Sequence, residues 1–172
     1  MKLIEAIRKR RSIRKFKPGA EVTDEQIKLL LEAAMLAPSA CNTRPWEFIV
    51  VKDRAVLDRI RKTHPYTGML ETASIAIIML ALPESQKNVR DGLPSGFYPQ
   101  DCGAATQNIL LQAVELGLGA CWCGVYPKDQ RVAEIRGIFG TEKLPFCVIA
   151  VGVPDENPEP RGKYDESKVT YI

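Results

Sequence analysis

The nine residues from Ser74 to Leu82, SIAIIMLAL, are apolar on both faces of any strand that they form. Strands buried on both faces read as continuous apolar runs, so we expect this segment to be a central strand of a sheet. Three other stretches favour strands, namely Trp46–Val51 (WEFIVV), residues 119–126 (GACWCGVY) and residues 144–153 (LPFCVIAVGV). The sequence therefore predicts a sheet of about four strands.

Five stretches favour helices. The pattern T-D-E-Q from Thr23 is typical of a capping box at the start of a helix, and Pro38 ends that helix. Its buried stripe is expected to comprise Ile27, Leu30, Leu31 and Ala34. The expected helices cover residues 2–11, 23–37, 53–62, 101–116 and 128–139. The fold class is therefore α+β, with residues 1–172 forming a single domain.

Positive charge is concentrated at the start of the chain. The whole sequence has 24 Lys and Arg against 21 Asp and Glu, but residues 1–18 contain eight basic side chains and a single acidic one. Such a cluster attracts a phosphorylated cofactor, a nucleic acid or an acidic partner. A solvated basic face is the simpler interpretation of a short basic run. The sequence contains no P-loop, and GLGACWCG has the wrong spacing for a dinucleotide-binding G-x-G-x-x-G motif.

Cysteine and histidine usage excludes several kinds of site. The five cysteines are odd in number and form no C-x-x-C pair, so we expect buried thiols in a reducing, cytoplasmic compartment. The one histidine, His64, lies in the polar stretch KTHPYTG and is interpreted as a solvated loop residue. We expect no metal site. No apolar run approaches the roughly 20 residues of a membrane span, and the start of the chain lacks the apolar region of a signal peptide.

Three motifs become informative together. The stretches RKRRSIRKF (8–16), APSACNTRPWEFIV (37–50) and LQAVELGLGACWCGVYP (111–127) occur in this order. In this order and spacing they resemble the nitroreductase family of FMN-dependent, NAD(P)H-utilising oxidoreductases. The resemblance extends over essentially the whole chain. It implies a mostly antiparallel sheet of about four strands, surrounded by helices, with a further strand contributed by a partner in a homodimer.

The resemblance also implies roles for individual residues. Arg10 and Ser12 would bind the FMN phosphate and ribityl chain, and Arg11 would contribute mainly through its backbone. Arg14 would lie near the flavin N1–O2 edge, where a cation stabilises the charge of reduced flavin. The remaining cofactor-binding residues are expected to be Pro38, Ser39, Ala40 and Asn42 at the other subunit's flavin, Cys123 and Gly124 near N5, and Arg161 and Lys163 at the phosphate.

The activity implied is hydride transfer from NAD(P)H to flavin N5 and then to a nitroaromatic, quinone or enone acceptor, in a ping-pong cycle. Flavin supplies this chemistry, so no catalytic acid or base is expected, and Arg14 acts as an electrostatic tuner. The alternative is a flavin-binding protein of the same fold without NAD(P)H turnover, such as a sensor, carrier or flavin-consuming enzyme. A nucleic-acid-binding role is not expected, because RKRRSIRK lacks interleaved aromatic residues.

Several residues allow a simpler structural role. Trp46 is interpreted as a core residue rather than as a residue that stacks on the flavin ring. The alternative role of Asn42 is to form a turn. Gly117 and Gly119 are interpreted as a helix stop and a tight turn, and Cys41 and Cys123 favour packing over redox chemistry. Arg44 stands where many relatives have Gln, which leaves the substrate preference open.

Two segments suggest functions outside the core. The polar stretch 83–96 is the candidate lid over the flavin. The tail 154–172 is rich in proline and charge, and we expect it to pack on the partner subunit. Its last residues, VTYI, favour a strand that extends the partner's sheet.

Overall fold

The computed structural model describes residues 3–86, 96–162 and 164–172. Four strands form one antiparallel sheet in the order β1–β2–β4–β3. They are β1 (Trp46–Val51), β2 (Ile75–Ala81), β3 (Gly119–Gly124) and β4 (Leu144–Gly152). Every residue of β2 is buried, which confirms the central strand predicted within Ser74–Leu82.

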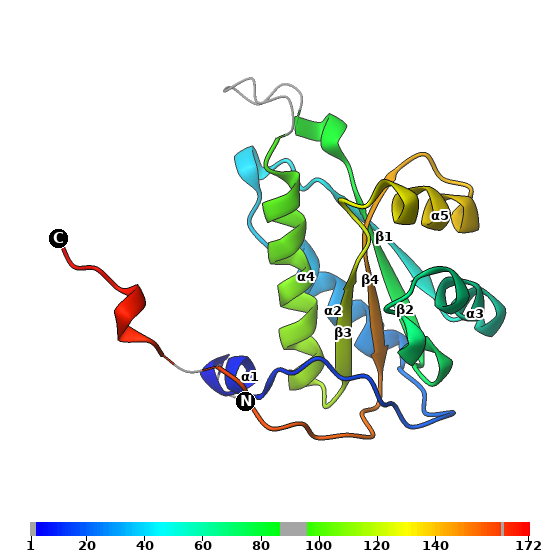
Figure 1. Ribbon diagram of the computed structural model, residues 1–172, viewed down its shortest axis with the longest axis horizontal. Coiled ribbons are helices and arrows are strands. Elements are labelled where there is room, and N and C mark those ends of the chain that lie inside the picture. Colours follow the sequence, from blue (N-terminus) through cyan, green and yellow to red (C-terminus); the bar gives the residue numbers. More distant parts are fainter. Residues whose placement is uncertain (1–2, 87–95, 163) are drawn as a thin grey trace.

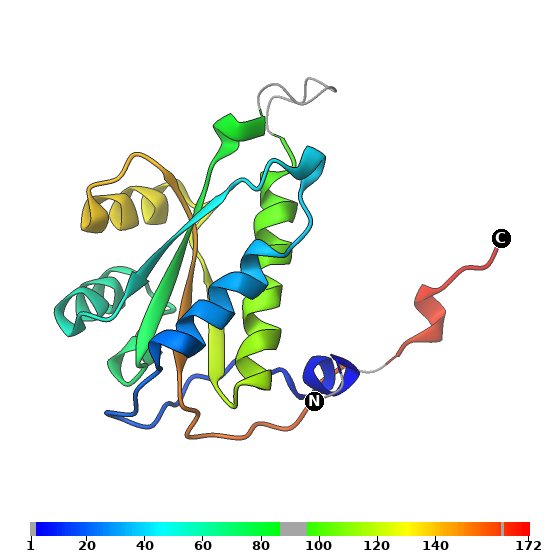
Figure 2. The same cartoon turned by 180° about the vertical axis from the view of Figure 1, so that it is seen from behind.

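Helices cover both faces of this sheet (Figures 1 and 2). The helices α2 (Asp24–Met35) and α4 (Tyr98–Glu115) lie on one face, and α3 (Arg54–Thr63) and α5 (Asp129–Phe139) lie on the other. Alternate residues of β2 enter two separate cores. Ile77 and Met79 pack with α2 and α4, whereas Ile78 and Leu80 pack with α3 and α5. The α+β class and the mostly antiparallel sheet are therefore confirmed.

Local capping sets the helix boundaries. Thr23 and Gln26 form the predicted capping box, in which each side chain accepts a hydrogen bond from the other residue's backbone N–H. The helix α4 begins at Tyr98, three residues before the predicted start at Asp101, and it has a proline in its first turn, where proline is well tolerated. Gly117, at φ +71°, follows the end of α4, as the interpretation of a helix stop requires.

The segment after α1 (Leu3–Lys9) crosses the end of the sheet. The N–H of Ile13 donates to the Ala120 carbonyl at 3.0 Å. A Cβ on Gly119 would lie 2.8 Å from Ile13 Cγ2, and one on Gly152 would lie 2.9 Å from Phe16 Cδ1. Glycine at these two positions therefore permits the close approach. The interpretation of Gly119 as a tight turn was wrong, because this residue begins β3 and is needed for packing.

The C-terminal segment first returns to the N-terminal segment. The Asp155 N–H donates to the Lys15 carbonyl at 2.9 Å, and the Glu156 carboxylate accepts from the Arg14 N–H at 2.5 Å and the Lys15 N–H at 3.1 Å. Residues 164–172 lie away from the sheet (Figures 1 and 2). Within the described ranges, no helix is both long and apolar enough to cross a bilayer. Residues 87–95 of the candidate lid, and Lys163, lie outside the described residues.

Candidate functional site

A cavity of about 470 Å³ lies beside β3 and joins residues from two of the sequence motifs. Its volume is in the range of about 300–1,000 Å³ that is typical of small-molecule sites. We refer to it as the Arg14 cavity. It is lined by Arg14, by Cys121, Trp122, Cys123 and Gly124 of β3, and by Pro65, Tyr66, Gly68 and Met69 from the turn after α3.

The other residues of the basic motif divide between two surfaces. Ser12 forms a parallel bridge with Ala120, the residue before Cys121, and Cys121 lines the Arg14 cavity. Arg11 instead lines a separate cavity of about 480 Å³ beside residues 154–160. Arg10 is half-buried just after α1, and its N–H donates to the Ala6 carbonyl at 2.9 Å. The structure therefore places Arg14 in the Arg14 cavity and Ser12 beside the strand that lines it, whereas Arg11 lines another cavity.

His64 is buried, with 1% of its surface exposed, and joins the turn after α3 to β3. Its Nε2 lies 2.9 Å from the Gly124 carbonyl oxygen, and its Nδ1 accepts the Tyr66 N–H at 3.2 Å. The interpretation of His64 as a solvated loop residue was wrong. The stretch KTHPYTG is polar in composition, but both ring nitrogens of His64 are hydrogen-bonded to backbone groups, which allows the ring to be buried.

Cys121 and Cys123 lie on the same face of β3, as expected for residues two apart on a strand. The pKa of Cys121 is lowered to about 7 by a hydrogen bond from Cys123, and by the Arg14 charge and the Ser12 hydroxyl, against the opposing effect of burial. The same thiol–thiol contact and burial raise the pKa of Cys123. Cys123 therefore stays a thiol, and its Sγ donates to the Tyr66 carbonyl at 3.1 Å.

Residues 39–44, which contain much of the loop predicted to face a partner's flavin, form an unusual turn. Cys41, Asn42 and Arg44 have φ values of +50°, +54° and +48°, a region that side-chain-bearing residues rarely adopt. The Arg44 N–H donates to Ser39 Oγ at 2.9 Å, and Arg44 Nε donates to Asn42 Oδ1 at 3.1 Å. Asn42 does form part of a turn, and the exposure of Cys41 contradicts the expectation that all five cysteines are buried.

Two buried polar residues support this turn, and sequence patterns do not reveal either. Asp101 is 7% exposed, and each of its carboxylate oxygens lies 3.2 Å from the Ala40 N–H. Gln86 Nε2 donates to Asp101 at 2.6 Å and to Thr43 Oγ1 at 2.9 Å. The one sequence signal concerned Asp101, which is an acidic residue in the first turn of α4 and is followed by small residues.

The two halves of the predicted site stay apart within one chain. None of Pro38, Ser39, Ala40 and Asn42 is among the described residues that line the Arg14 cavity. Arg161 is exposed in the C-terminal segment. Trp46 is buried in the core with α2 and α4, as expected. Among the described residues, no group of three or more His, Cys, Asp and Glu side chains is placed to hold a metal ion.

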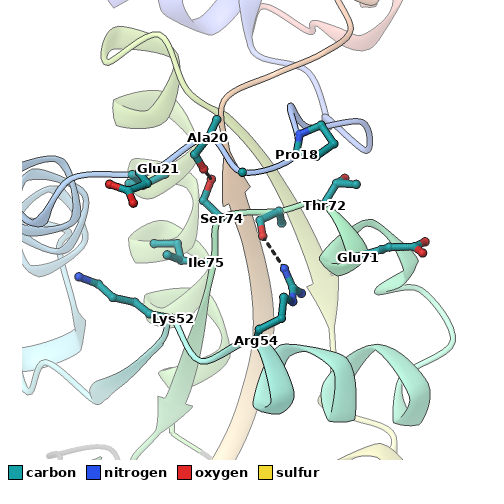
Figure 3. Close-up of a pocket in the computed structure, with 12 residues that line it drawn as sticks. Pro18, Ala20, Glu21, Lys52, Arg54, Glu71, Thr72, Ser74 and Ile75 are labelled. Carbon is teal, nitrogen blue, oxygen red and sulfur yellow. Dashed lines mark hydrogen bonds between the residues drawn. The ribbon is translucent and has the colours of Figure 1, made fainter.

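A third cavity, of about 490 Å³, lies beside the first residue of β2 (Figure 3). Its cations already have protein partners, because Arg54 donates to the carbonyls of Leu70 and Ala73 and Lys52 pairs with Asp24. Glu21 and Glu71 also line it and oppose anion binding. None of the predicted site residues within the described part of the chain lines this cavity. The Arg14 cavity is therefore the candidate functional site.

The chain is similar to known proteins over most of its length. The Nitroreductase family model matches residues 7–65 and 62–153. A Methanothermobacter thermautotrophicus protein, whose name pairs NADH dehydrogenase with NAD(P)H nitroreductase, is 46% identical over 171 residues, covering 98% of this chain and 86% of that protein. A similarly named structure from Bacteroides thetaiotaomicron VPI-5482 has 40% identity, a TM-score of 0.88, and coverage of 98% and 96% of the two chains. An FMN-dependent nitroreductase structure from Clostridium difficile R20291 has 33% identity, a TM-score of 0.83, and covers 98% of each chain.

Proposed function

The chain belongs to the nitroreductase family, and on this premise we propose that it is an oxidoreductase that holds FMN in the Arg14 cavity and uses NAD(P)H as electron donor. One observation carries the placement. Arg14 and the Cys123–Gly124 stretch, which come from motifs more than 100 residues apart, line one cavity. Bound FMN supplies the chemistry of accepting and giving up hydride.

The residues of the Arg14 cavity fit this cofactor. Arg14 is the only charged residue among the described residues that line the cavity. A flavin also needs backbone donors and acceptors at its polar edge, and β3 is an edge strand of the sheet. The cavity in Figure 3 is less suitable for an anionic cofactor, because carboxylates lie there beside cations that are already paired.

We assign distinct tasks to the basic residues. Arg14 holds the negative charge that reduction places on the cofactor, and Arg10 and Ser12 bind the phosphate and ribityl chain. Arg11 contributes through its backbone, since its side chain lines another cavity. Arg161 and Lys163 complete the phosphate site in this proposal.

We further propose a ping-pong order, in which donor and acceptor use the same cavity in turn. The acceptor is a nitroaromatic, a quinone or an enone. No side chain has to act as an acid or a base. Buried thiols lining the cavity support a cytoplasmic protein, because such thiols persist in reducing compartments.

The active unit in this proposal is a homodimer with shared flavin sites. Two features support it. The loop Pro38–Asn42 does not line its own chain's Arg14 cavity, so it is available to the partner's cavity. Exposed apolar side chains also occur on the short helix α1, at the C-terminal end of α2 and on the tail. They are Leu3, Ile4, Ile7, Met35, Leu36, Tyr164, Tyr171 and Ile172.

The tail has a specific place in this dimer. Residues 155 and 156 pair with the N-terminal segment, whereas residues 164–172 are exposed and lie away from the sheet (Figure 1). An apolar groove of about 650 Å³, lined by residues of α2 such as Ile27, Leu31 and Met35, faces solvent in the single chain. We propose that the tail packs on the partner and that residues 169–172 extend the partner's sheet.

The decisive experiment identifies the flavin and its reduction. Untagged protein is purified, denatured and chromatographed for released flavin. We expect FMN, at one per chain. FAD, or no flavin and no binding on reconstitution, contradicts the proposal.

The donor and the order of steps are tested on the same protein. Anaerobic NADH or NADPH should bleach the flavin absorbance. After removal of the nucleotide by gel filtration, a quinone should restore it. FMN that stays oxidised with both nucleotides identifies the flavin-binding alternative without turnover.

A further inference from the structure

His64 lies next to the Arg14 cavity, because its two ring nitrogens contact two residues that line it, Gly124 and Tyr66. On one side, the ring contacts the Gly124 carbonyl of β3, 2.9 Å from Nε2. On the other, the Tyr66 N–H lies 3.2 Å from Nδ1. A carbonyl can only accept and an N–H can only donate, so this arrangement requires a neutral ring with its proton on Nε2.

Tyr66 is held through both of its backbone polar groups. Its N–H donates to His64, and its carbonyl accepts from Cys123 Sγ at 3.1 Å. Tyr66, Cys123 and Gly124 all line the Arg14 cavity. The hydrogen bonds of His64 and Cys123 therefore connect the turn to β3 at two points. Both bonds are accepted by residues that line the cavity.

The helix α5 adds a further contact to the turn and to β3, through Arg131. Arg131 lies over the Tyr66 ring, with Cζ 5.0 Å from the ring centroid, and its Nη1 donates to the Gly124 carbonyl at 3.3 Å. The Gly124 carbonyl thus accepts from His64 and from Arg131. Because two donors hold this carbonyl, the Gly124 peptide plane has little freedom to rotate.

We propose that His64 is a positioning residue of the FMN site: as the neutral Nε2–H tautomer it fixes the spacing between the 65–69 turn and Cys123–Gly124. This inference rests on the proposed function, in that it takes the ligand of the Arg14 cavity to be FMN. His64 does not line the cavity and acts through Gly124 and Tyr66.

Two conservative variants separate the two contacts. His64→Asn places an amide near the position of Nδ1, which keeps an acceptor for Tyr66 and loses the bond to Gly124. His64→Gln places an amide near Nε2, which keeps the donor to Gly124 and loses the acceptor for Tyr66. Ser74→Ala is the matched control, because it removes a partly buried hydrogen bond, from Ser74 Oγ to the Ala20 carbonyl at 2.5 Å, outside the Arg14 cavity.

The tautomer can be read directly, because the chain contains one histidine. Nitrogen NMR of untagged protein labelled with ¹⁵N-histidine should show a protonated Nε2 and an unprotonated Nδ1 at neutral pH. An Nδ1–H tautomer or an imidazolium overturns the proposal. This measurement uses the wild-type chain, so it does not depend on the variants folding.

The positioning role is tested by FMN titration and by the visible circular dichroism of bound FMN. Each His64 variant should bind FMN about three- to tenfold more weakly, which corresponds to one lost hydrogen bond, and should alter the dichroism. Ser74→Ala should change neither. Unaltered affinity and dichroism in both His64 variants overturn the positioning role. Wild-type protein that binds no FMN instead overturns the proposed function and leaves the tautomer result standing.

Discussion

Gly119 lies directly opposite Gly152 in the β3–β4 ladder, at the place where the N-terminal segment crosses the sheet. The Ile13 side chain occupies the space that a Cβ on Gly119 would need, and the Phe16 side chain occupies the space that a Cβ on Gly152 would need. Arg14 lies between these two anchored residues in sequence, so its position depends on two glycines more than 100 residues away.

Gly152→Ala should therefore weaken both folding and FMN binding. The new Cβ would meet Phe16 Cδ1 at 2.9 Å and the backbone nitrogen of Ser74 at 3.1 Å, and overpacking of this kind costs about 1–3 kcal/mol. Urea unfolding and FMN titration measure the two effects. Gly137→Ala is the control, since its Cβ meets nothing within 4 Å in α5, and alanine there should stabilise by up to about 1 kcal/mol. Equal stability of Gly152→Ala and wild type would refute the close-approach argument.

Arg14→Ala should lower the midpoint potential of the bound flavin more than it lowers FMN affinity, because a cation near the ring stabilises its reduced form. Arg10→Ala should do the reverse and weaken FMN binding by about 1.5–3 kcal/mol, the range for hydrogen bonds to charged groups. Potentiometric and fluorescence titrations separate the two effects. Arg61→Ala, which removes a charge paired with Asp58 on α3, serves as control. A potential unchanged by Arg14→Ala shows that this guanidinium faces away from the flavin.

Asp101→Leu should release the loop around residues 39–44. The Ala40 N–H and the Gln86 amide would lose their shared acceptor, and leaving such buried groups unsatisfied costs about 1–3 kcal/mol. Asp101→Asn should cost less, because its amide oxygen still accepts from Ala40 and Gln86 can turn its own amide oxygen toward it. Chemical unfolding compares the two variants. Equal losses for Leu and Asn would show that the network does not adapt in this way.

Stability should rise between pH 7 and pH 9 in a way that depends on Cys121. Its pKa is about 7 in the folded chain, against an ordinary value of 9.0. Its contribution is therefore complete above pH 9 and is lost as the pH falls through 7. Burial raises the pKa of Cys102 and Cys147 to about 12, and the contact with Cys121 together with burial raises the pKa of Cys123, so these three thiols act in the opposite direction and only above pH 9. Under reducing conditions, Cys121→Ala should remove the rise between pH 7 and 9, as measured by urea unfolding at several pH values. A rise that persists in this variant assigns it to another group.

Deleting Lys168–Ile172 should weaken the proposed dimer while leaving the fold of each chain intact. These residues are exposed and lie away from the sheet (Figure 2). Light scattering over a range of protein concentrations, with FMN content measured in parallel, tests this. Wild-type FMN affinity should fall on dilution below the dimer dissociation constant. A monomer that keeps its FMN and full activity contradicts the shared site but not the cofactor.

The sequence by itself determined the elements of the fold. Trp46–Val51 is predicted and observed with the same bounds, and the capping box at Thr23 starts α2. Both are local signals, because strand alternation and helix capping involve residues within a few positions of one another. The three motifs likewise indicated the nitroreductase family, since each motif is a short contiguous stretch.

Only the tertiary structure decided how these pieces make a site. His64 lies in a polar turn by composition, but it is buried because Gly124, 60 positions away, supplies an acceptor for its ring. Asp101 is buried for the same reason, through Ala40 and Gln86. A polar side chain is buried when the fold brings it a partner, and that partner is set by packing rather than by its neighbours in sequence. The local pattern therefore predicted which segments form helices and strands, whereas the packing of distant segments determined which polar groups line and support the Arg14 cavity.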